Sequence, residues 1–266
     1  MDANLNPKTG KDNAALWGAR AHDWGEVQEP TMEPVFQEVL DKLAAGPGIR
    51  HLDIGCGAGM AALLANARGS EVVGLDASEA LLDFARARAP GVAFHAGDME
   101  ELPFDDCSFH TISAINALQY AGNPPVALRE AARLLRPDGR IAIVTWADTE
   151  KMEAARFNAC LRPLLPPPPK DAPHPFNLSG EKALRDFALG AGLEPLESGE
   201  VEAPWIYKDR TTALRGVLSA GVVVRAMQIL GEDVVREAYS KALEQFRQPG
   251  GGYRIGATFR YLLAAA

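Results

Sequence analysis

The sequence is poor in cysteine, and its few cysteines form no recognisable pattern. Cys56, Cys107 and Cys160 lack the paired spacing of a disulfide framework and the close spacing of metal ligands. An odd number of unpaired cysteines is typical of a reducing compartment, so we expect a cytoplasmic location. No structural zinc or other bound metal is predicted.

The chain also lacks an excess of positive charge. It has 27 Lys and Arg against 35 Asp and Glu, which gives a formal net charge of -8 at pH 7. Nucleic acids and anionic membranes attract basic surfaces, so this balance disfavours both as partners. A small molecule is the partner that we expect.

Long hydrophobic runs are absent as well. The stretch that comes closest, 217–230, is too short to cross a bilayer and contains Arg225. The first residues, MDANLNPKTGKDNAALW, lack the charged start and the apolar run of a signal peptide. These absences predict a chain without a membrane span.

What is present fits one large globular domain, with 266 residues, of which 47% are hydrophobic and 23% charged. Changes of pattern along the sequence divide this domain into parts. We expect a helical N-terminal cap over 1–45, a core over 46–148, an insertion over 149–178, and a C-terminal half over 179–266 with a helical lid at about 208–248.

In the core, short apolar runs alternate with helical patterns. Strands are predicted over 49–54, 71–75, 91–96, 109–115 and 140–146. Helices are predicted between them, over 60–67, 79–89 and 124–135. Such alternation requires crossover connections, so we predict an α/β fold with a mostly parallel sheet and helices on both faces.

The flanking parts are predicted to be mainly helical. In the cap, 14–45 has a helical pattern with Pro34 at a helix start. The insertion is predicted as a helix over about 150–165 and a proline-rich loop. The C-terminal half is predicted as a helix over 181–190, one or two strands over 193–207, helices over 211–230 and 232–246, and a last strand over 253–263.

A glycine-rich loop, DIGCGAG at 53–59, joins the first strand of the core to its first helix. Such a turn lets the backbone approach a ligand closely, and the helix N-terminus offers unpaired N–H groups. Its glycines, Gly55, Gly57 and Gly59, follow the pattern G-x-G-x-G. A dinucleotide fingerprint needs its third glycine one position later, where this chain has Met60, so a pyrophosphate ligand is disfavoured.

Further motifs follow this loop in a fixed order. They are the acidic end of VVGLD (Asp76), the segment GDMEELPF (Asp98 and Met99), the strand TISAINALQY, and the turn LLRPDGRIAIV. With these motifs, the stretch from about 49 to 146 resembles class I S-adenosylmethionine-dependent methyltransferases, near the menaquinone and ubiquinone C-methyltransferases and many bacterial natural-product methyltransferases. The resemblance implies a Rossmann-like sheet of seven strands and S-adenosylmethionine as cofactor, with S-adenosylhomocysteine as product.

The resemblance also implies where the donor binds. Asp76 is expected to accept both ribose hydroxyls, and Asp98 to accept from the adenine amine between the apolar side chains of Leu75 and Met99. The carbonyls of Gly55 and Asn116 are expected to meet the methionine ammonium.

Two contributions to the donor site are less direct. Asp53 is expected either to order the N–H groups of the loop or to hold the ammonium through water. Arg20 of the cap, with Trp17 and Trp24, is expected to close over the donor, with an exposed arginine as the alternative. The full predicted donor site is Trp17, Arg20, Asp53, Gly55, Cys56, Gly57, Gly59, Leu75, Asp76, Ala77, Gly97, Asp98, Met99 and Asn116.

The sequence departs from the family pattern at the start of the fourth strand. The family usually has Phe-Asp there, and this chain has Phe109 and His110. Any network built on that aspartate is therefore in doubt. We interpret His110 as a structural residue of the core or the sheet edge.

The acceptor is harder to predict, because methyl transfer from a sulfonium is an in-line displacement that needs no fixed catalytic residue. A phenol, hydroxyl or carbon acid would gain from a general base, and His22, His174 and Tyr207 are the candidates, although a structural role is favoured for each. The expected pocket walls are Trp17, Tyr120, Trp146, Phe157, Phe176, Trp205 and Tyr207.

These apolar and aromatic side chains favour a small, apolar or aromatic acceptor, such as a natural product or a quinone-like molecule, methylated on O, C or N. Residues 116–119 read NALQ instead of the N-P-P-Y type motif, which disfavours amino-methylation of bases or of glutamine. Three different functions stay open: a donor-binding enzyme that catalyses a cyclisation, a non-catalytic relative of the fold, and a nicotinamide-dependent oxidoreductase. A monomer or a homodimer is expected.

Overall fold

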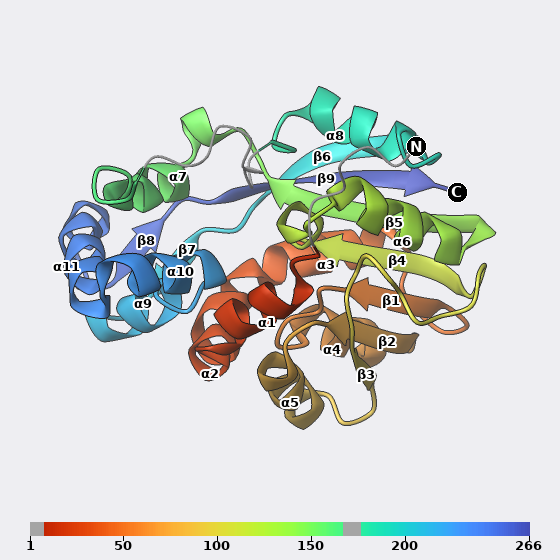
Figure 1. Ribbon diagram of the computed structural model, residues 1–266, viewed down its shortest axis with the longest axis horizontal. Coiled ribbons are helices and arrows are strands. Elements are labelled where there is room, and N and C mark those ends of the chain that lie inside the picture. Colours follow the sequence, from red (N-terminus) through yellow and green to blue (C-terminus); the bar gives the residue numbers. More distant parts are fainter. Residues whose placement is uncertain (1–7, 167–176) are drawn as a thin grey trace.

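A seven-stranded, mostly parallel sheet forms the centre of the molecule (Figure 1). The computed structural model describes residues 8–166 and 177–266. The strand order is β3-β2-β1-β4-β5-β9-β6, with β9 antiparallel to both β5 and β6. The strands are β1 Arg50–Ile54, β2 Glu71–Asp76, β3 Ala93–Ala96, β4 Phe109–Ile115, β5 Leu135–Trp146, β6 Glu194–Glu202 and β9 Thr258–Ala265. The predicted fold class is confirmed.

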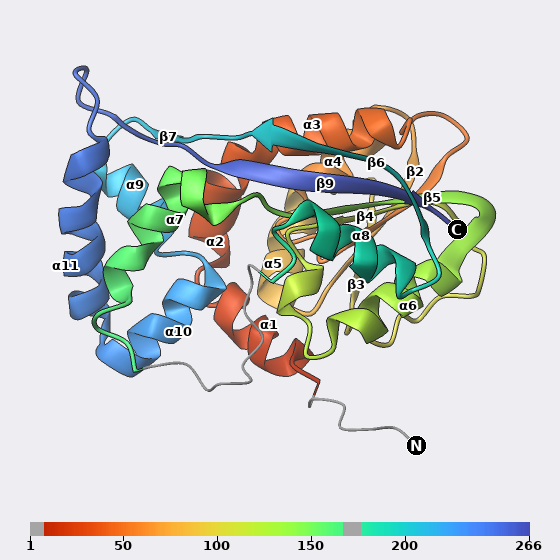
Figure 2. The ribbon, with the colours of Figure 1, turned by 90° about the horizontal axis from the view of Figure 1, so that it is seen from above.

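Helices cover both faces of this sheet. Figure 2 shows α3 (Glu33–Lys42) on one side and α6 (Pro124–Leu134) and α8 (Glu181–Leu189) on the other. The helix α4 (Met60–Ala67) packs against α3 and β2, and α5 (Glu79–Arg88) packs against β3.

Local sequence explains how these helices form. Two prolines occupy the first turn of α6, and its buried residues Ala127, Leu128, Ala131 and Leu134 lie three or four positions apart on one face. Ser78 caps α5 by accepting the N–H of Leu81. The core helices therefore follow the predicted pattern.

The cap is a series of short helices. It consists of α1 (Gly10–Gly18), α2 (Ala21–Asp23), a π-helical turn (Trp24–Gln28), a 3-10 turn (Glu29–Met32) and then α3. The prediction of helix from 14 to 45 is right in type, but the helix is not continuous. Figure 1 shows α1 between the sheet and the helices of the lid.

The lid lies beyond the carboxyl ends of the parallel strands (Figure 1). It contains α9 (Arg210–Val217), α10 (Gly221–Leu230) and α11 (Glu232–Leu243). A small hairpin of β7 (Trp205–Tyr207) and β8 (Tyr253–Ile255) packs beside it. A single helix over 211–230 was the wrong prediction. The chain bends by 91° between α9 and α10, because Ala220 has an extended backbone before α10 begins.

Two other predicted elements are divided in the structure. The last strand, predicted over 253–263, is β8 followed by β9, and the N–H of Gly256 between them donates to Glu153 at 2.6 Å. The helix predicted over 150–165 is α7 (Glu153–Asn158) between 3-10 turns at Thr149–Lys151 and Ala159–Leu161.

Two large hydrophobic cores hold these parts together. One fills the space between the sheet and α6 and α8. The other joins the opposite face of the sheet, through α3, to the lid, and includes Phe157, Trp205, Tyr239 and Phe259. The lid is thus continuous with a core of the sheet.

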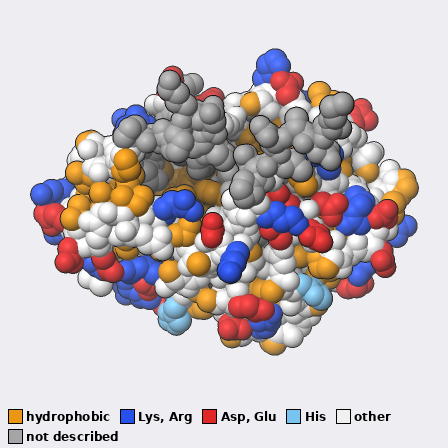
Figure 3. Space-filling view, in the orientation of Figure 1, with side chains coloured by type: hydrophobic (Ala, Val, Ile, Leu, Met, Phe, Trp, Pro, Cys, Tyr) orange, Lys and Arg blue, Asp and Glu red, His pale blue; other side chains and the backbone are white. Residues whose placement is uncertain are grey.

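The outer surface of the lid is partly apolar. Hydrophobic side chains gather over the lid helices (Figure 3), where Val222, Ile229 and Val234 are each about half exposed. Among the described residues, no single helix has the length and apolar character needed to cross a membrane. The bent pair α9 and α10 meets those two criteria only when taken together.

Candidate active site

A cavity opens at the carboxyl ends of β1, β2 and β4, where the cap covers the sheet. Its empty volume is about 970 Å³, which includes space open to solvent. All predicted donor residues except Gly59 and Arg20 line it. They are Trp17, Asp53, Gly55, Cys56, Gly57, Leu75, Asp76, Ala77, Gly97, Asp98, Met99 and Asn116.

The glycine loop after β1 has the conformation that its sequence requires. Gly55, Gly57 and Gly59 all have positive φ angles, of 67°, 56° and 83°. A Cβ atom on Gly55 would lie 2.5 Å from the Cβ of Ala117. Gly55 can therefore pack this closely against Ala117 only because it carries no side chain.

The N–H groups of this loop all have acceptors in the structure. Gly55 and Cys56 donate to the carbonyl of Leu75, and Gly57 donates to Oδ2 of Asp76 at 3.0 Å. Ala58 donates to Oε1 of Glu29 at 2.8 Å. Asp53 accepts none of these bonds, so its predicted ordering of the loop N–H groups is not what the structure shows.

Asp76 lies at the end of β2 and faces the cavity. Its two oxygens accept the N–H groups of Gly57 and Ser78, at 3.0 and 2.9 Å. Burial raises the pKa of this carboxyl, while those backbone donors lower it. The carboxylate is thereby fixed in orientation beside the glycine loop.

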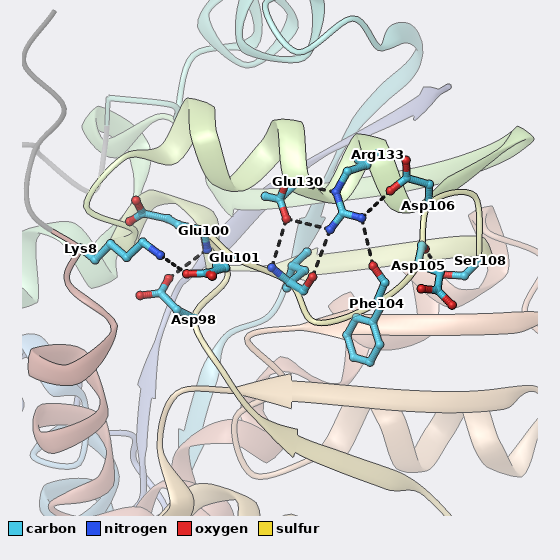
Figure 4. A network of polar contacts seen from close by, with 11 residues as sticks. Lys8, Asp98, Glu100, Glu101, Phe104, Asp105, Asp106, Ser108, Glu130 and Arg133 are labelled. Atoms are coloured by element: carbon cyan, nitrogen blue, oxygen red, sulfur yellow. Dashed lines mark hydrogen bonds and ion pairs between the residues drawn. The ribbon is translucent and has the colours of Figure 1, made fainter. Parts of the chain in front are cut away.

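Asp98 lies on the loop after β3, which Arg133 of α6 anchors. Arg133 donates to the carbonyls of Leu102 and Phe104, both at 3.0 Å, and pairs with Glu130 and Asp106 (Figure 4). These carboxylates raise the pKa of Arg133 well above its ordinary value.

The same loop also has local contacts. Oδ1 of Asp98 accepts the N–H of Glu100 at 2.9 Å. Glu100 in turn accepts the backbone N–H of Asn123 at 3.0 Å and its side-chain amide at 2.8 Å. Lys8, at the start of the described cap, pairs with Glu101 beside Asp98 (Figure 4). The cap and α6 thus hold the loop from two sides.

Asp53 is 2% exposed and lines the floor of the cavity. Its Oδ1 accepts the hydroxyl of Ser113 at 2.7 Å. Burial raises the pKa of Asp53 to about 7, and the nearby charge of Asp76 adds to this effect, while Ser113 opposes it. Its protonation therefore changes near neutral pH.

Asn116 turns the chain sharply at the end of β4. Its φ of 53° is left-handed, which asparagine tolerates better than most residues. The 3-10 turn η3 (Leu118–Tyr120) follows, and the carbonyl of Tyr120 accepts bonds from Asn13 at 2.7 Å and Thr9 at 3.1 Å. The cap is thereby attached to the loop after β4.

Aromatic rings of the cap and of η3 form one wall. Trp17 makes edge contacts with Trp24, at 4.9 Å between ring centroids, and with Tyr120, at 5.3 Å. All three line the cavity, together with Met32 and Phe36. The part of the lining that the cap and η3 contribute is therefore largely apolar and aromatic.

Glu29 joins the cap to the glycine loop and is 4% exposed. Besides accepting the N–H of Ala58, it forms an ion pair with Arg88 of α5. Arg88 also donates to the carbonyls of Ala58, at 2.9 Å, and Gly25. Burial raises the pKa of Glu29 to about 7, although Arg88 lowers it. The buried pair holds the cap on the loop.

Several predicted site residues lie elsewhere. Arg20 does not line the cavity and pairs with Glu232 of α11 at 2.7 Å, and Gly59 begins α4 behind the loop. His22 has 72% of its side chain exposed. Tyr207 is buried, and its hydroxyl donates to Gln28 at 2.7 Å. Burial raises the pKa of Tyr207 far above its ordinary value.

Only some of the predicted wall residues on the acceptor side line the cavity. Of the predicted walls, Trp17 and Tyr120 line the cavity, whereas Trp146, Phe157 and Trp205 pack in or against the hydrophobic core of the lid. His174 and Phe176 lie outside the described residues. His110 accepts the backbone N–H of Arg50 at 3.0 Å, a structural contact as interpreted.

Sequence reasoning missed Glu29, Arg88 and the polar partners of Asp53. Glu29 and Arg88 meet across 59 positions, so no local pattern marks the pair. His51, Thr111 and Ser113 left a signal, because they are polar residues at alternate positions of two buried strands. That alternation could have pointed to a polar network beneath the glycine loop.

Comparison with known proteins places the core of the chain in one family. Residues 52–143 match the family described as "Methyltransferase domain". An uncharacterized protein of Mycobacterium tuberculosis is 29% identical over 188 residues, 69% of this chain and 67% of that protein. The 27-O-demethylrifamycin SV methyltransferase of Amycolatopsis mediterranei is 36% identical over 140 residues, 48% of this chain and about half, 52%, of that enzyme.

Solved structures share the fold at low identity. A putative methyltransferase of Bacillus halodurans has a TM-score of 0.58 and 20% identity, over 86% of this chain and 97% of that one. The (4+2)-cyclase SpnF has a TM-score of 0.60 and 18% identity, and the match covers 98% of this chain and 97% of SpnF. Geranyl diphosphate C-methyltransferase from Streptomyces coelicolor, solved with S-adenosyl-L-homocysteine, has a TM-score of 0.51 and 16% identity, over 87% and 74%.

The sheet order, the glycine turn and the matched domain define an α/β fold of the methyltransferase type. The methyltransferase match over residues 52–143, together with the methyltransferase relatives, supports a class I S-adenosylmethionine-dependent methyltransferase.

Proposed function

We propose that the cavity holds the methyl donor with its adenosine over the ends of β2 and β3 and its methionine part over the glycine loop. Asp76 accepts the ribose hydroxyls, Asp98 accepts the adenine amine, and Leu75 and Met99 contact the ring. The observation that carries this proposal is the convergence of Asp53, Asp76 and Asp98 on one cavity with the left-handed turn at Gly55 and Gly57.

For the acceptor, we propose a small, apolar or aromatic molecule of natural-product or quinone-like type. The wall of Trp17, Trp24, Met32, Phe36 and Tyr120 supports this class. The face of the protein in Figure 3 mixes acidic and basic side chains, without the single basic patch that a nucleic acid would favour. O-, C- and N-methylation are all compatible with such a wall.

The donor, when bound, supplies an electrophilic methyl group on a sulfonium. The chain's own residues then act mainly by positioning. The glycine turn and the fixed carboxylates orient the donor, and the cap encloses the reacting atoms and keeps water out. Tyr207 and His22 do not line the cavity, so neither is placed to remove a proton from the acceptor in this conformation.

The chain is proposed to act as one domain, with the cap (1–45) and the lid (208–248) around the acceptor. A cytoplasmic location, a role in secondary metabolism and a monomeric or homodimeric state complete the proposal. The rifamycin methyltransferase among the relatives supports a natural-product acceptor.

A donor-binding cyclase is the second candidate. The similarity in fold to the (4+2)-cyclase SpnF, which covers 98% of this chain, supports this second candidate function. The two functions differ in the fate of the methyl group. Incubation with donor labelled in its methyl group and a panel of phenolic and quinone-like acceptors should transfer label to an acceptor if the chain is a methyltransferase.

Calorimetric titration separates both functions from an oxidoreductase and from a non-catalytic relative of the fold. S-Adenosylhomocysteine is expected to bind, and NADH is not. Tight binding of S-adenosylhomocysteine without label transfer to any acceptor would favour the cyclase. Preferential binding of NADH would instead support an oxidoreductase, and binding of neither ligand a non-catalytic relative.

A further inference from the structure

Buried polar side chains lie beneath the cavity, between β1 and β4. In the register of these parallel strands, His51 is opposite Thr111 and Asp53 is opposite Ser113. Side chains alternate between the faces of a strand, so these four share one face. Leu52, Ile112 and Ala114 on the other face belong to the hydrophobic core against α6 and α8.

Hydrogen bonds connect these four side chains in one line. Nδ1 of His51 is 2.9 Å from the Thr111 hydroxyl, and Nε2 is 3.0 Å from Oγ of Ser113. Ser113 uses its only proton to donate to Oδ1 of Asp53 at 2.7 Å. Ser113 must therefore accept from Nε2–H of His51, and Nδ1 of His51 accepts from Thr111.

In a neutral imidazole, this arrangement places the proton on Nε2. His51 has no exposed surface, and burial lowers its pKa to about 4, so the ring stays neutral at physiological pH. Every donor and acceptor of the two ring nitrogens is used. Fully satisfied buried networks of this kind hold their members in one orientation.

The network ends at the cavity. Asp53 is 2% exposed and lines the cavity, and within the described parts of the chain its Oδ2 accepts no hydrogen bond. A carboxylate that lines a cavity can accept a hydrogen bond from a ligand held there. Since Oδ1 is held by Ser113, Oδ2 is the oxygen left for that ligand.

We propose that Ser113 and His51 are positioning residues that hold Asp53 with Oδ2 toward the cavity, where it accepts a hydrogen bond from the ammonium of the donor's methionine part. This inference rests on the proposed donor site. Without Ser113, both oxygens of Asp53 lose a fixed direction, and the ammonium loses an acceptor that is already oriented.

Two ligands test the proposal by calorimetry. S-Adenosylhomocysteine carries the ammonium, and 5′-methylthioadenosine shares the adenosine but lacks the amino-acid part. The substitution Ser113→Ala is expected to weaken binding of S-adenosylhomocysteine by about tenfold and to leave binding of 5′-methylthioadenosine unchanged. The second ligand thus reports whether the adenosine half is still intact.

Further variants separate positioning from general damage. Ser113→Thr keeps the hydroxyl and is expected to restore binding. His51→Leu acts one step away from Asp53 and is expected to weaken only S-adenosylhomocysteine, by about threefold. Ser70→Ala is the matched control, because Ser70 is a buried serine bonded to the carbonyl of Gly46, outside the cavity lining.

The outcomes distinguish the positioning role from the donor site itself. Equal weakening of both ligands by Ser113→Ala, or no change for either, would overturn the positioning role while leaving the donor site in place. If the wild-type protein binds neither ligand, the proposed function fails and the inference fails with it. Selective loss of S-adenosylhomocysteine with rescue by Ser113→Thr is the result that we expect.

Discussion

The donor side of the cavity and the cap and lid around it are built on different principles. On the donor side, the ends of β1, β2 and β4 fix the backbone, and single positions such as Gly55 and Asp76 have one residue type that fits. In the cap, Met32 and Phe36 belong both to the cavity wall and to the hydrophobic core that continues into the lid. On the donor side, individual positions each require a particular residue. In the cap and lid, the structure depends on the packing of many apolar side chains together.

The largest expected effect tests whether Phe157 of α7, which packs against the lid, belongs to the hydrophobic core or to the cavity wall. Phe157 is 1% exposed and packs among Trp205, Tyr239 and Phe246. Phe157→Ala is expected to lower the free energy of unfolding by about 3–5 kcal/mol, measured by chemical denaturation. Affinity for S-adenosylhomocysteine should stay unchanged, and a small loss of stability with a large loss of donor affinity would place Phe157 in the wall.

The glycine turn is the corresponding test on the donor side. Gly55→Ala combines a left-handed φ of 67° with a contact of 2.5 Å to Ala117, and should cost about 2–5 kcal/mol of stability. Gly48→Ala is the matched control, because its φ is 81° but no atom lies within 4 Å of the added methyl. It should cost only about 1–2 kcal/mol. Equal costs would mean that close approach at Gly55 is unimportant.

Asp76 tests the chemistry of the donor side. Asp76→Ala removes a paired acceptor and is expected to weaken binding of S-adenosylhomocysteine by roughly 1.5–3 kcal/mol, as measured by calorimetry. Asp105→Ala, on an exposed loop outside the cavity lining, serves as control. Unchanged affinity in a folded Asp76→Ala protein would refute the assignment to the ribose.

Donor affinity is expected to depend on pH through Asp53. Burial raises its pKa to about 7, and only the ionised carboxylate accepts from an ammonium. Affinity for S-adenosylhomocysteine should therefore be constant above this pKa and fall by about tenfold per pH unit below it. Titrations across that range with wild type and Asp53→Asn give the test, and a wild-type profile as flat as that of the variant would contradict it.

The smallest effects concern the loop that carries Asp98. Arg133→Met removes the two bonds to the carbonyls of Leu102 and Phe104 and should lower stability by about 1–3 kcal/mol in a denaturation experiment. Lys8→Ala removes only an exposed ion pair with Glu101 and should have no measurable effect. If Lys8→Ala proved as damaging as Arg133→Met, the cap would contribute as much to this loop as α6.

The difference between the two regions also explains what the sequence could predict. The core strands, the glycine loop, Asp76 and Asp98 follow from local periodicity and motif order, and the structure brings their side chains to one cavity. The contact of Glu29 with Ala58 and Arg88 joins segments far apart in the chain, so no spacing could indicate it. The bend between α9 and α10 interrupts an apolar pattern that is continuous in the sequence.

For the acceptor side, the sequence predicts which types of residue are present but not which of them line the cavity. Trp17 and Trp205 are both tryptophans outside the core stretch 46–148. Trp17 lines the cavity, whereas Trp205 is buried in the hydrophobic core that reaches into the lid. An aromatic residue suits a ligand wall and a core equally, because both require burial of apolar surface. Only the packing of the helices decides between them.

A crystal structure with S-adenosylhomocysteine tests the proposed donor site most directly. We expect the ribose hydroxyls on Asp76, the adenine amine on Asp98 and the ammonium on Asp53, with the thioether directed toward Trp17 and Tyr120. A ligand bound outside this cavity, or inside it with its ribose away from Asp76, would contradict the proposed site.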